Sequence, residues 1–349
     1  LAGVPQMIIS GGTIISSIFS SRILRKFGTG RVTAVSVAMT AVALLGFGLT
    51  PSFWWLLLAA VPLGLGAGAV DAGLNAYVAS HYESRHMSWL HSFWGVGALS
   101  GPLVLSGFLS YGMSWRYGYL SIAAIQFVLV LLLLNTVPLW EKVRVRKSGS
   151  GETEDTSHRP VLSYLGIGGV KAALLTFLIY CGIESSMGLW GGSFLYRVKG
   201  VEAASAARWV SVFYASITAG RTITGFITLR ISNTTLTRWG GILILAGVLG
   251  MVLPLPLSFT LGGFVLVGLG CAPIFPCMLH ETPVRFGRQH SQAVMGLQMG
   301  SAYIGATFLP PFFGFISSCT SMALFPIFLL GYSALLIAGS ETVRRVTVN

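Results

Sequence analysis

Residues 54–80 read WWLLLAAVPLGLGAGAVDAGLNAYVAS, an apolar stretch in which Asp71 carries the only charge. A helix needs about 20 apolar residues to cross the roughly 30 Å hydrocarbon core of a bilayer. A helix also satisfies its own backbone hydrogen bonds, which is a requirement in lipid. The stretch therefore predicts a membrane-spanning helix.

The rest of the chain has the same character. Of its 349 residues, 54% are hydrophobic and 9% are charged, whereas about a quarter of the residues in a soluble domain are charged. The sequence therefore predicts an all-α membrane protein. By the same length test we expect eleven spans, at residues 5–24, 32–50, 54–80, 90–111, 115–137, 170–195, 205–229, 235–254, 257–279, 291–316 and 322–339.

The net charge of +12 would point to nucleic acid in a soluble protein. Here Lys and Arg lie in short gaps between apolar stretches, and basic gaps alternate with nearly uncharged ones, apart from the gap after residue 195. Such alternation marks the cytoplasmic side of a membrane protein. We expect a multi-pass protein of the plasma membrane with a cytoplasmic C-terminus, in contact with lipid and with no nucleic acid.

One polar stretch, containing RVRKSGSGETEDTSHRP at residues 144–160, interrupts the apolar pattern. It predicts three parts: an N-terminal helical bundle of five spans at 1–137, a cytoplasmic linker at 138–164, and a C-terminal bundle of six spans at 165–349.

The two bundles show a weak internal repeat, which is typical of secondary transporters. A shift of 204 residues aligns Gly64-Leu65-Gly66 with Gly268-Leu269-Gly270, Ser21 with Gly225, Lys26 with Arg230, and Gly101 with Gly305. The span at 170–195 then has its counterpart before residue 1. We therefore expect an intact protein of twelve helices, of which the first is missing from this chain.

Several motifs resemble one known family. SSRILRKFGTGRV (20–32) is similar to the loop signature of the major facilitator superfamily. GLGAGAVDAGLNAYV (64–78), HSFWGVGALSGP (91–102), AGRTITGF (219–226) and GLGCAPIFP (268–276) resemble its fucose-permease-like branch. The resemblance implies two pseudo-symmetric bundles that rock about a central site and so move a small polar solute, such as a sugar, across the membrane by alternating access.

The same resemblance implies coupling to a proton or another ion. Two alternatives remain open: a multidrug or metabolite exporter, and a non-transporting membrane sensor, scaffold or inactive fragment, because a fold does not determine a function. The chain has no phosphate-binding loop and no catalytic constellation, so we expect neither an enzyme nor a cofactor. We expect the protein to be a monomer.

The loop signature departs from the family pattern. Arg25 stands where the family usually has Asp, and Ser21 where it has Gly. The resemblance implies a role in conformational change for this motif, whereas a basic loop that only sets topology is the alternative. The motif and its counterpart in the second half comprise Arg22, Arg25, Lys26, Gly28, Arg31, Gly225 and Arg230.

Three charged side chains lie well inside predicted spans, where charge is costly and function is the first hypothesis. Asp71 has Asn75 one turn later on the same helix face. The resemblance implies that Asp71 belongs to the proton and solute pathway, and the alternative is a hydrogen bond that only holds the helix bundle together. Glu184 and Arg221 are the other two.

Aromatic residues flank Glu184, with Tyr180 one turn before it and Trp190 after it. Aromatic rings stack on sugars or on cations, and a carboxylate accepts hydrogen bonds from hydroxyl groups. Trp190 could instead lie in the interfacial aromatic belt. Arg221 could neutralise Glu184, or it could donate to carbonyl groups where helices pack closely.

The spans at 90–111 and 291–316 are repeat counterparts and supply the remaining candidates. His91, Trp94 and Gln298 are candidate cavity residues, with a hydrogen bond between helices as the alternative for Gln298.

Two further patterns predict structure rather than chemistry. Cys181, Cys271, Cys277 and Cys319 lie in or beside apolar stretches without ligand spacing, so we expect core residues, no metal site and no disulfide. His280-Glu281 lacks the second His of a zinc motif, and Pro283 is expected to break the helix that carries it.

Overall fold

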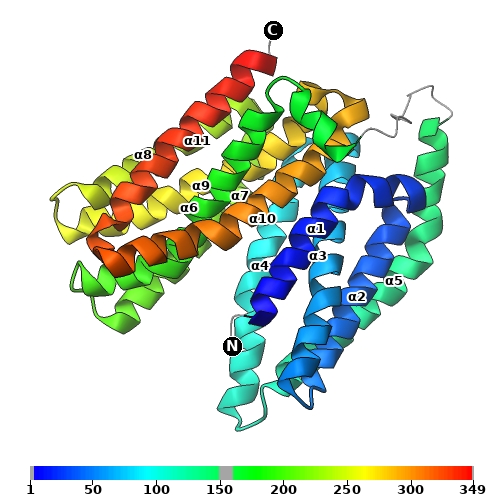
Figure 1. The fold of residues 1–349 in the computed structure, drawn as a ribbon, viewed down its shortest axis with the longest axis horizontal. Helices are drawn as coiled ribbons and strands as arrows, with labels where there is room; N and C mark the ends of the chain where they lie inside the picture. The colour runs from blue at the N-terminus through cyan, green and yellow to red at the C-terminus, as the bar shows by residue number, and fades with distance from the viewer. Residues whose placement is uncertain (1–3, 149–159, 348–349) are drawn as a thin grey trace. The chain divides into compact units, whose positions relative to one another are not determined.

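The computed structural model describes residues 4–148 and 160–347, and most of that length is helical (Figure 1). The described part contains two short 3-10 helices, η1 (Val161–Gly166) and η2 (Met322–Leu324). Its eleven α-helices are α1 (Val4–Phe27), α2 (Thr29–Gly48), α3 (Phe53–His81), α4 (Ser84–Ser110), α5 (Arg116–Ser148), α6 (Val170–Arg197), α7 (Ala203–Ile227), α8 (Asn233–Val252), α9 (Leu257–Phe286), α10 (Arg288–Cys319) and α11 (Phe325–Thr347).

Each expected span corresponds to one of these helices, so the all-α prediction is confirmed. Ten helices in the described part are long and apolar enough to cross a bilayer. The remaining one, α7, has 25 residues, which is long enough to cross. It carries Arg208, Arg221 and a series of Ser and Thr residues, which lower its mean hydropathy.

Several helices continue beyond their predicted ends, and α5 and α9 are two of them. Helix α5 extends past residue 137 to Ser148, while residues 149–159 of the predicted linker lie outside the described residues. The expectation that Pro283 breaks its helix was wrong, because α9 continues to Phe286 with Pro273, Pro276 and Pro283 inside it. Membrane helices tolerate proline where neighbouring helices and hydroxyl side chains satisfy the freed backbone groups.

The chain divides into two compact units, and the first comprises residues 1–80, 97–164 and 287–300. Within it, α2 packs along α5 (Figure 1). Helix α1 packs against α3 through small residues: the hydroxyl of Thr13 donates to the Gly64 carbonyl at 3.1 Å, and that of Ser17 to the Gly68 carbonyl at 3.2 Å. Small residues allow such close approach of helices in a membrane.

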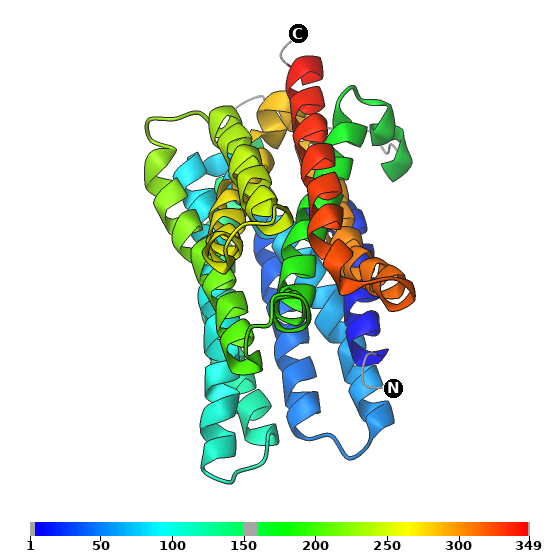
Figure 2. The ribbon, with the colours of Figure 1, turned by 90° about the vertical axis from the view of Figure 1, so that its left-hand side faces the viewer.

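The second unit comprises residues 81–96, 165–286 and 301–349. Its centre is α9, which packs against both α7 and α8, while α11 packs against α6 and α8. Figure 2 shows α8 and α9 as neighbours joined by a short connection. Helix α9 is the most enclosed element, with Phe264, Val267, Cys271 and Leu279 fully buried. The candidate site described below lies in this unit.

Two helices contribute to both units. The division falls after residue 96 in α4 and after residue 300 in α10. These two points are 204 residues apart, which is the offset of the repeat detected in the sequence. The predicted bundles, 1–137 and 165–349, are continuous stretches of sequence on either side of the polar linker, whereas the two units are defined by contacts in space. The predicted bundle boundaries therefore stay a prediction.

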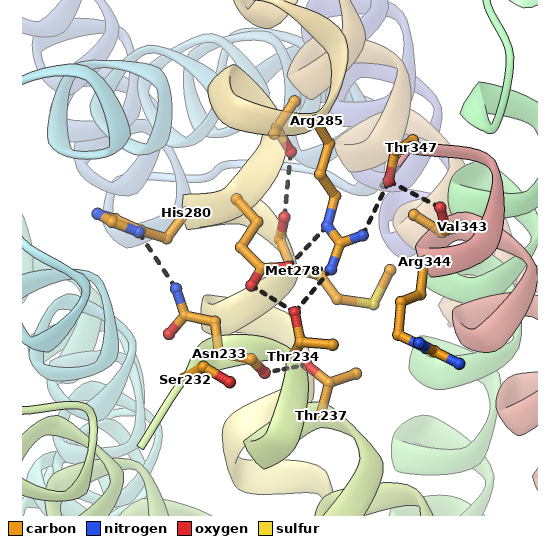
Figure 3. Close-up of polar contacts among 12 residues, drawn as sticks. Ser232, Asn233, Thr234, Thr237, Met278, His280, Arg285, Val343, Arg344 and Thr347 are labelled. Atoms are coloured by element: carbon orange, nitrogen blue, oxygen red, sulfur yellow. Dashed lines mark hydrogen bonds and ion pairs between the residues drawn. The ribbon is translucent and has the colours of Figure 1, made fainter. Parts of the chain in front are cut away.

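A polar cluster joins the ends of three helices of the second unit (Figure 3). The guanidinium of Arg285 in α9 donates to the Glu281 carboxylate at 2.6 Å, to the Thr234 hydroxyl of α8 at 3.0 Å and to the Thr347 hydroxyl of α11 at 2.9 Å. One guanidinium therefore links α8, α9 and α11.

Candidate functional site

A carboxylate, a phenol and a guanidinium meet between α6 and α7. The hydroxyl of Tyr180 donates to Oε2 of Glu184 at 2.6 Å. Nη2 of Arg221 donates to the same oxygen at 3.2 Å and to the Tyr180 hydroxyl at 3.1 Å. Tyr180 and Glu184 meet because residues four apart share a helix face. The three groups form a closed triangle around one carboxylate oxygen.

The ion pair of this triangle is well shielded. The side chains of Arg221 and Glu184 are 5% and 13% exposed. Removing two charges from water is costly unless they pair and hydrogen-bond well, and the cost is higher inside a membrane. The pairing of Glu184 with Arg221, which was one of two alternatives from the sequence, is present.

Arg221 also reaches the first half of α4, which belongs to the same unit. Its Nη1 donates to the His91 carbonyl at 3.4 Å, and its guanidinium lies 5.3 Å from the ring centroid of Trp94. The other sequence-based alternative, donation to a carbonyl, is therefore present as well. Nε of Arg221 is buried and has no hydrogen-bond partner among the described residues.

An aromatic wall supports the triangle from α9. The ring of Phe275 contacts Tyr180 at 5.7 Å, Phe177 at 5.1 Å and the imidazole of His91 at 4.9 Å between ring centroids. The Tyr180 ring is tilted on Phe275, while Phe177 and His91 meet Phe275 edge to face, an arrangement that adds stabilisation beyond simple burial. Phe275 was not a candidate from the sequence, because a Phe inside an apolar stretch is indistinguishable from a core residue.

A second tyrosine borders the site. The hydroxyl of Tyr214 in α7 lies over Gly188 in α6, so closely that a Cβ atom at Gly188 would collide with it. Tyr214 was not a candidate from the sequence. Its spacing of seven residues from Arg221, two turns on the same helix face, was the available signal.

Asp71 and Asn75 contact each other in α3. Nδ2 of Asn75 donates to Oδ1 and to the backbone carbonyl of Asp71, both at 2.9 Å. Asn75 is fully buried, and Asp71 is half-buried. The same-face prediction is confirmed, whereas the role of Asp71 in transport stays a prediction.

Trp190 contacts α10 rather than the triangle. Its indole Nε1 donates to the Pro310 carbonyl at 2.8 Å, and its ring packs on Phe313 at 6.0 Å. These contacts attach the end of α6 to α10. Gln298 is buried in the first half of α10, which belongs to the first unit.

The motif expected as a loop is largely helical: its residues lie at the end of α1, at the start of α2, and near and just beyond the end of α7. Gly28 has a positive φ of 79°, which favours glycine, and it separates the two helices. Gly225 lies directly under the indole of Trp89, and Arg230 is exposed after the end of α7. The remaining members are Arg22, whose guanidinium lies 5.6 Å from the Phe19 ring, Lys26, whose ammonium lies 5.2 Å from the Phe27 ring, and Arg25 and Arg31. A role for this motif in conformational change stays a prediction.

The cysteines are only partly as expected. Cys271 and Cys277 are buried and Cys181 is half-buried, but Cys319 is exposed because it is the last residue of α10. The assignment of Cys319 as a core residue was therefore wrong. Residues 4–148 and 160–347 contain no cluster of His, Cys, Asp and Glu side chains that could hold a metal ion.

Comparison with known proteins defines the class. The sequence profile of the Major Facilitator Superfamily matches residues 1–310. The chain is 23% identical to the glucose/mannose transporter GlcP of Bacillus subtilis, over 96% of this chain and 83% of the relative. It is 24% identical to the cis,cis-muconate transport protein of Acinetobacter baylyi, over 93% of this chain and 80% of the relative.

A likeness to a solved structure supports the same fold. A variant of the E. coli fucose:proton symporter FucP superimposes with a TM-score of 0.73 at 16% sequence identity, covering 98% of this chain and 90% of that one. The family match and the fold together define a multi-pass secondary transporter. The chain belongs to the Major Facilitator Superfamily.

Proposed function

We propose that the protein is a proton-coupled symporter of a small polar solute, in the first instance a sugar, and that Glu184 carries the proton. The observation behind this proposal is the triangle of Glu184, Tyr180 and Arg221, in which a single carboxylate oxygen takes two donors. A carboxylate that is both shielded and paired is the kind of group whose protonation changes its surroundings most.

The proposed coupling follows from charge. Without a proton, Glu184 is negative and holds Arg221 in an ion pair. A proton on Glu184 removes that negative charge, so Arg221 loses its counter-ion. The Tyr180 hydrogen bond to Oε2 also loses its charge assistance, which makes it roughly half as strong. The donors of Arg221 then become available to an oxygen atom of the solute. Proton binding and solute binding thereby favour each other.

The aromatic side chains suit a sugar. Trp94 is 50% exposed and lies beside Arg221. Indole rings stack on the apolar faces of sugars, while nearby charged groups accept or donate hydrogen bonds to the hydroxyls. The names of the relatives, a glucose/mannose transporter and a fucose:proton symporter, favour the same class of solute. We also propose that Asp71 belongs to the pathway of the proton and the solute. We propose further that the protein is a monomer in the plasma membrane, with its C-terminus in the cytoplasm.

A second candidate solute is a small carboxylate. When Glu184 is protonated, Arg221 is left as a shielded positive charge with an unpartnered Nε. An anionic solute would restore the charge balance that such a site needs. The resemblance to a cis,cis-muconate transport protein is consistent with this alternative.

Uptake into proteoliposomes tests the proposal and separates the two solute classes. A panel of labelled hexoses, pentoses and small carboxylates would be offered with and without an inward proton gradient. We expect accumulation of at least one sugar only when the gradient is present. If only carboxylates accumulate with the gradient, the solute is a small carboxylate and not a sugar. If uptake does not depend on the gradient, proton coupling is refuted.

A further inference from the structure

Next to the triangle, the phenol of Tyr214 occupies the space that the absent side chain of Gly188 leaves free. Gly188 follows Glu184 by four residues, so it lies on the same face of α6 about 6 Å further along the axis. The Tyr214 hydroxyl fills the space where a side chain at this position would be, with the ring carbons Cζ and Cε2 close behind it. Any residue other than glycine at position 188 would displace this hydroxyl.

Among the described residues, the Tyr214 hydroxyl has no hydrogen-bond partner. The Tyr214 side chain is only half-buried. The ring is held by packing on Phe213 at 5.1 Å between centroids. A phenol whose hydroxyl has no partner among the described residues and is not closed off by them, beside a shielded carboxylate, has the features of a ligand contact, because a few well-placed polar groups orient a ligand.

Helices α6 and α7 therefore present polar groups at two levels. Glu184 and Arg221 form the first, and the Tyr214 hydroxyl forms the second, about one helical turn away along α6. A solute with oxygen atoms on opposite sides of a ring could bind both levels at once. A solute with a single polar end could reach only one of them.

We propose that Tyr214 is a specificity-determining residue, which binds a second hydroxyl of the solute and thereby selects polyhydroxylated rings, and that Gly188 exists to hold this phenol in place. This inference rests on the proposed function, since it assumes that the solute binds at Glu184 and Arg221. It adds the requirement that the solute carry a second oxygen group.

The test compares Tyr214→Phe with the wild type in uptake of the best sugar from the panel. The variant keeps the ring and its packing and loses only the hydroxyl. We expect the KM to rise about tenfold, as the loss of one hydrogen bond to a ligand implies, while the maximal rate and the dependence on the proton gradient stay unchanged. Among the analogues of that sugar that lack one hydroxyl, at least one should have the same KM in the wild type and in Tyr214→Phe, because it lacks the hydroxyl that Tyr214 binds.

Tyr332→Phe is a matched control. Tyr332 in α11 also has a hydroxyl without a described partner, but its ring packs on Phe328 and not on the site. We expect a wild-type KM for this variant. Gly188→Ala should raise the KM as Tyr214→Phe does. In the double variant, Gly188→Ala should raise the KM by less than it does in the wild type, because the hydroxyl that it displaces is already absent.

The outcomes separate this inference from the proposed function. If the wild type accumulates the sugar and Tyr214→Phe has an unchanged KM, then Tyr214 does not bind the solute and this inference alone is wrong. If the wild type accumulates no sugar on the panel, the proposed solute class is wrong, and the inference is overturned with it.

Discussion

Nη2 of Arg221 lies 3.2 Å from Oε2 of Glu184, and the Tyr180 hydroxyl bonds to both groups. The two charged residues come from adjacent helices of one unit, α6 and α7. The relationship gives the second unit a shielded ion pair that joins α6 to α7.

Tyr180→Phe should change how transport responds to pH. The phenol supplies one of the two hydrogen bonds to Oε2 of Glu184, and Arg221 supplies the other. Without the phenol only the Arg221 donor is left, and we expect the pH profile of uptake to differ from that of the wild type. Uptake rates measured between pH 5 and 9 check this, with Tyr332→Phe as the control. An unchanged profile would show that the hydroxyl has no such effect.

Replacing one member of the Glu184–Arg221 ion pair should destabilise the protein more than replacing both members. Glu184→Gln leaves Arg221 as a shielded charge without its counter-ion, and Arg221→Gln does the same to Glu184. We expect each single variant to be destabilised by about 3 kcal/mol, and the double variant by less. Thermal unfolding in detergent measures this. A double variant as unstable as the sum of the two single ones would mean that the two side chains do not interact.

Arg285→Met should loosen the ends of three helices. Its guanidinium bonds to Glu281, Thr234 and Thr347 (Figure 3). Charge-assisted hydrogen bonds contribute about 1.5 kcal/mol or more each, so we expect a clear fall in the unfolding temperature. Arg345→Met, at an exposed position of α11, is the matched control. Equal stability of the two variants would contradict the importance of the cluster.

Asp71→Asn separates a structural role from a transport role. The new amide keeps a carbonyl oxygen that can accept from Asn75, which now bonds to Oδ1 of Asp71 at 2.9 Å. We therefore expect near wild-type stability together with slower proton-driven uptake. If uptake and its pH dependence were both intact, Asp71 would be only a packing residue.

Much of the fold was accessible from the sequence, because length and hydropathy alone identify helices in lipid. The contact between Tyr180 and Glu184 was accessible too, since their spacing puts them on one helix face. The partner of Arg221 remained one of two alternatives, because periodicity carries no information about how two helices are rotated against each other.

Other parts of the site could not be foreseen. The significance of Gly188 depends on the distance between α6 and α7, and that of Phe275 on the rotation of α9. Trp190 could equally have lain at the membrane interface, and only tertiary packing shows its bond to the Pro310 carbonyl.

The proton-carrying role of Glu184 is tested most directly by comparing two assays on Glu184→Gln in proteoliposomes: accumulation driven by a proton gradient, and exchange of labelled for unlabelled solute without a gradient. An amide at this position mimics the protonated side chain in charge, so solute binding and exchange should persist. We predict that accumulation is lost while exchange continues at a rate near that of the wild type. Gradient-driven accumulation at the wild-type level would contradict the account, because another group would then carry the proton.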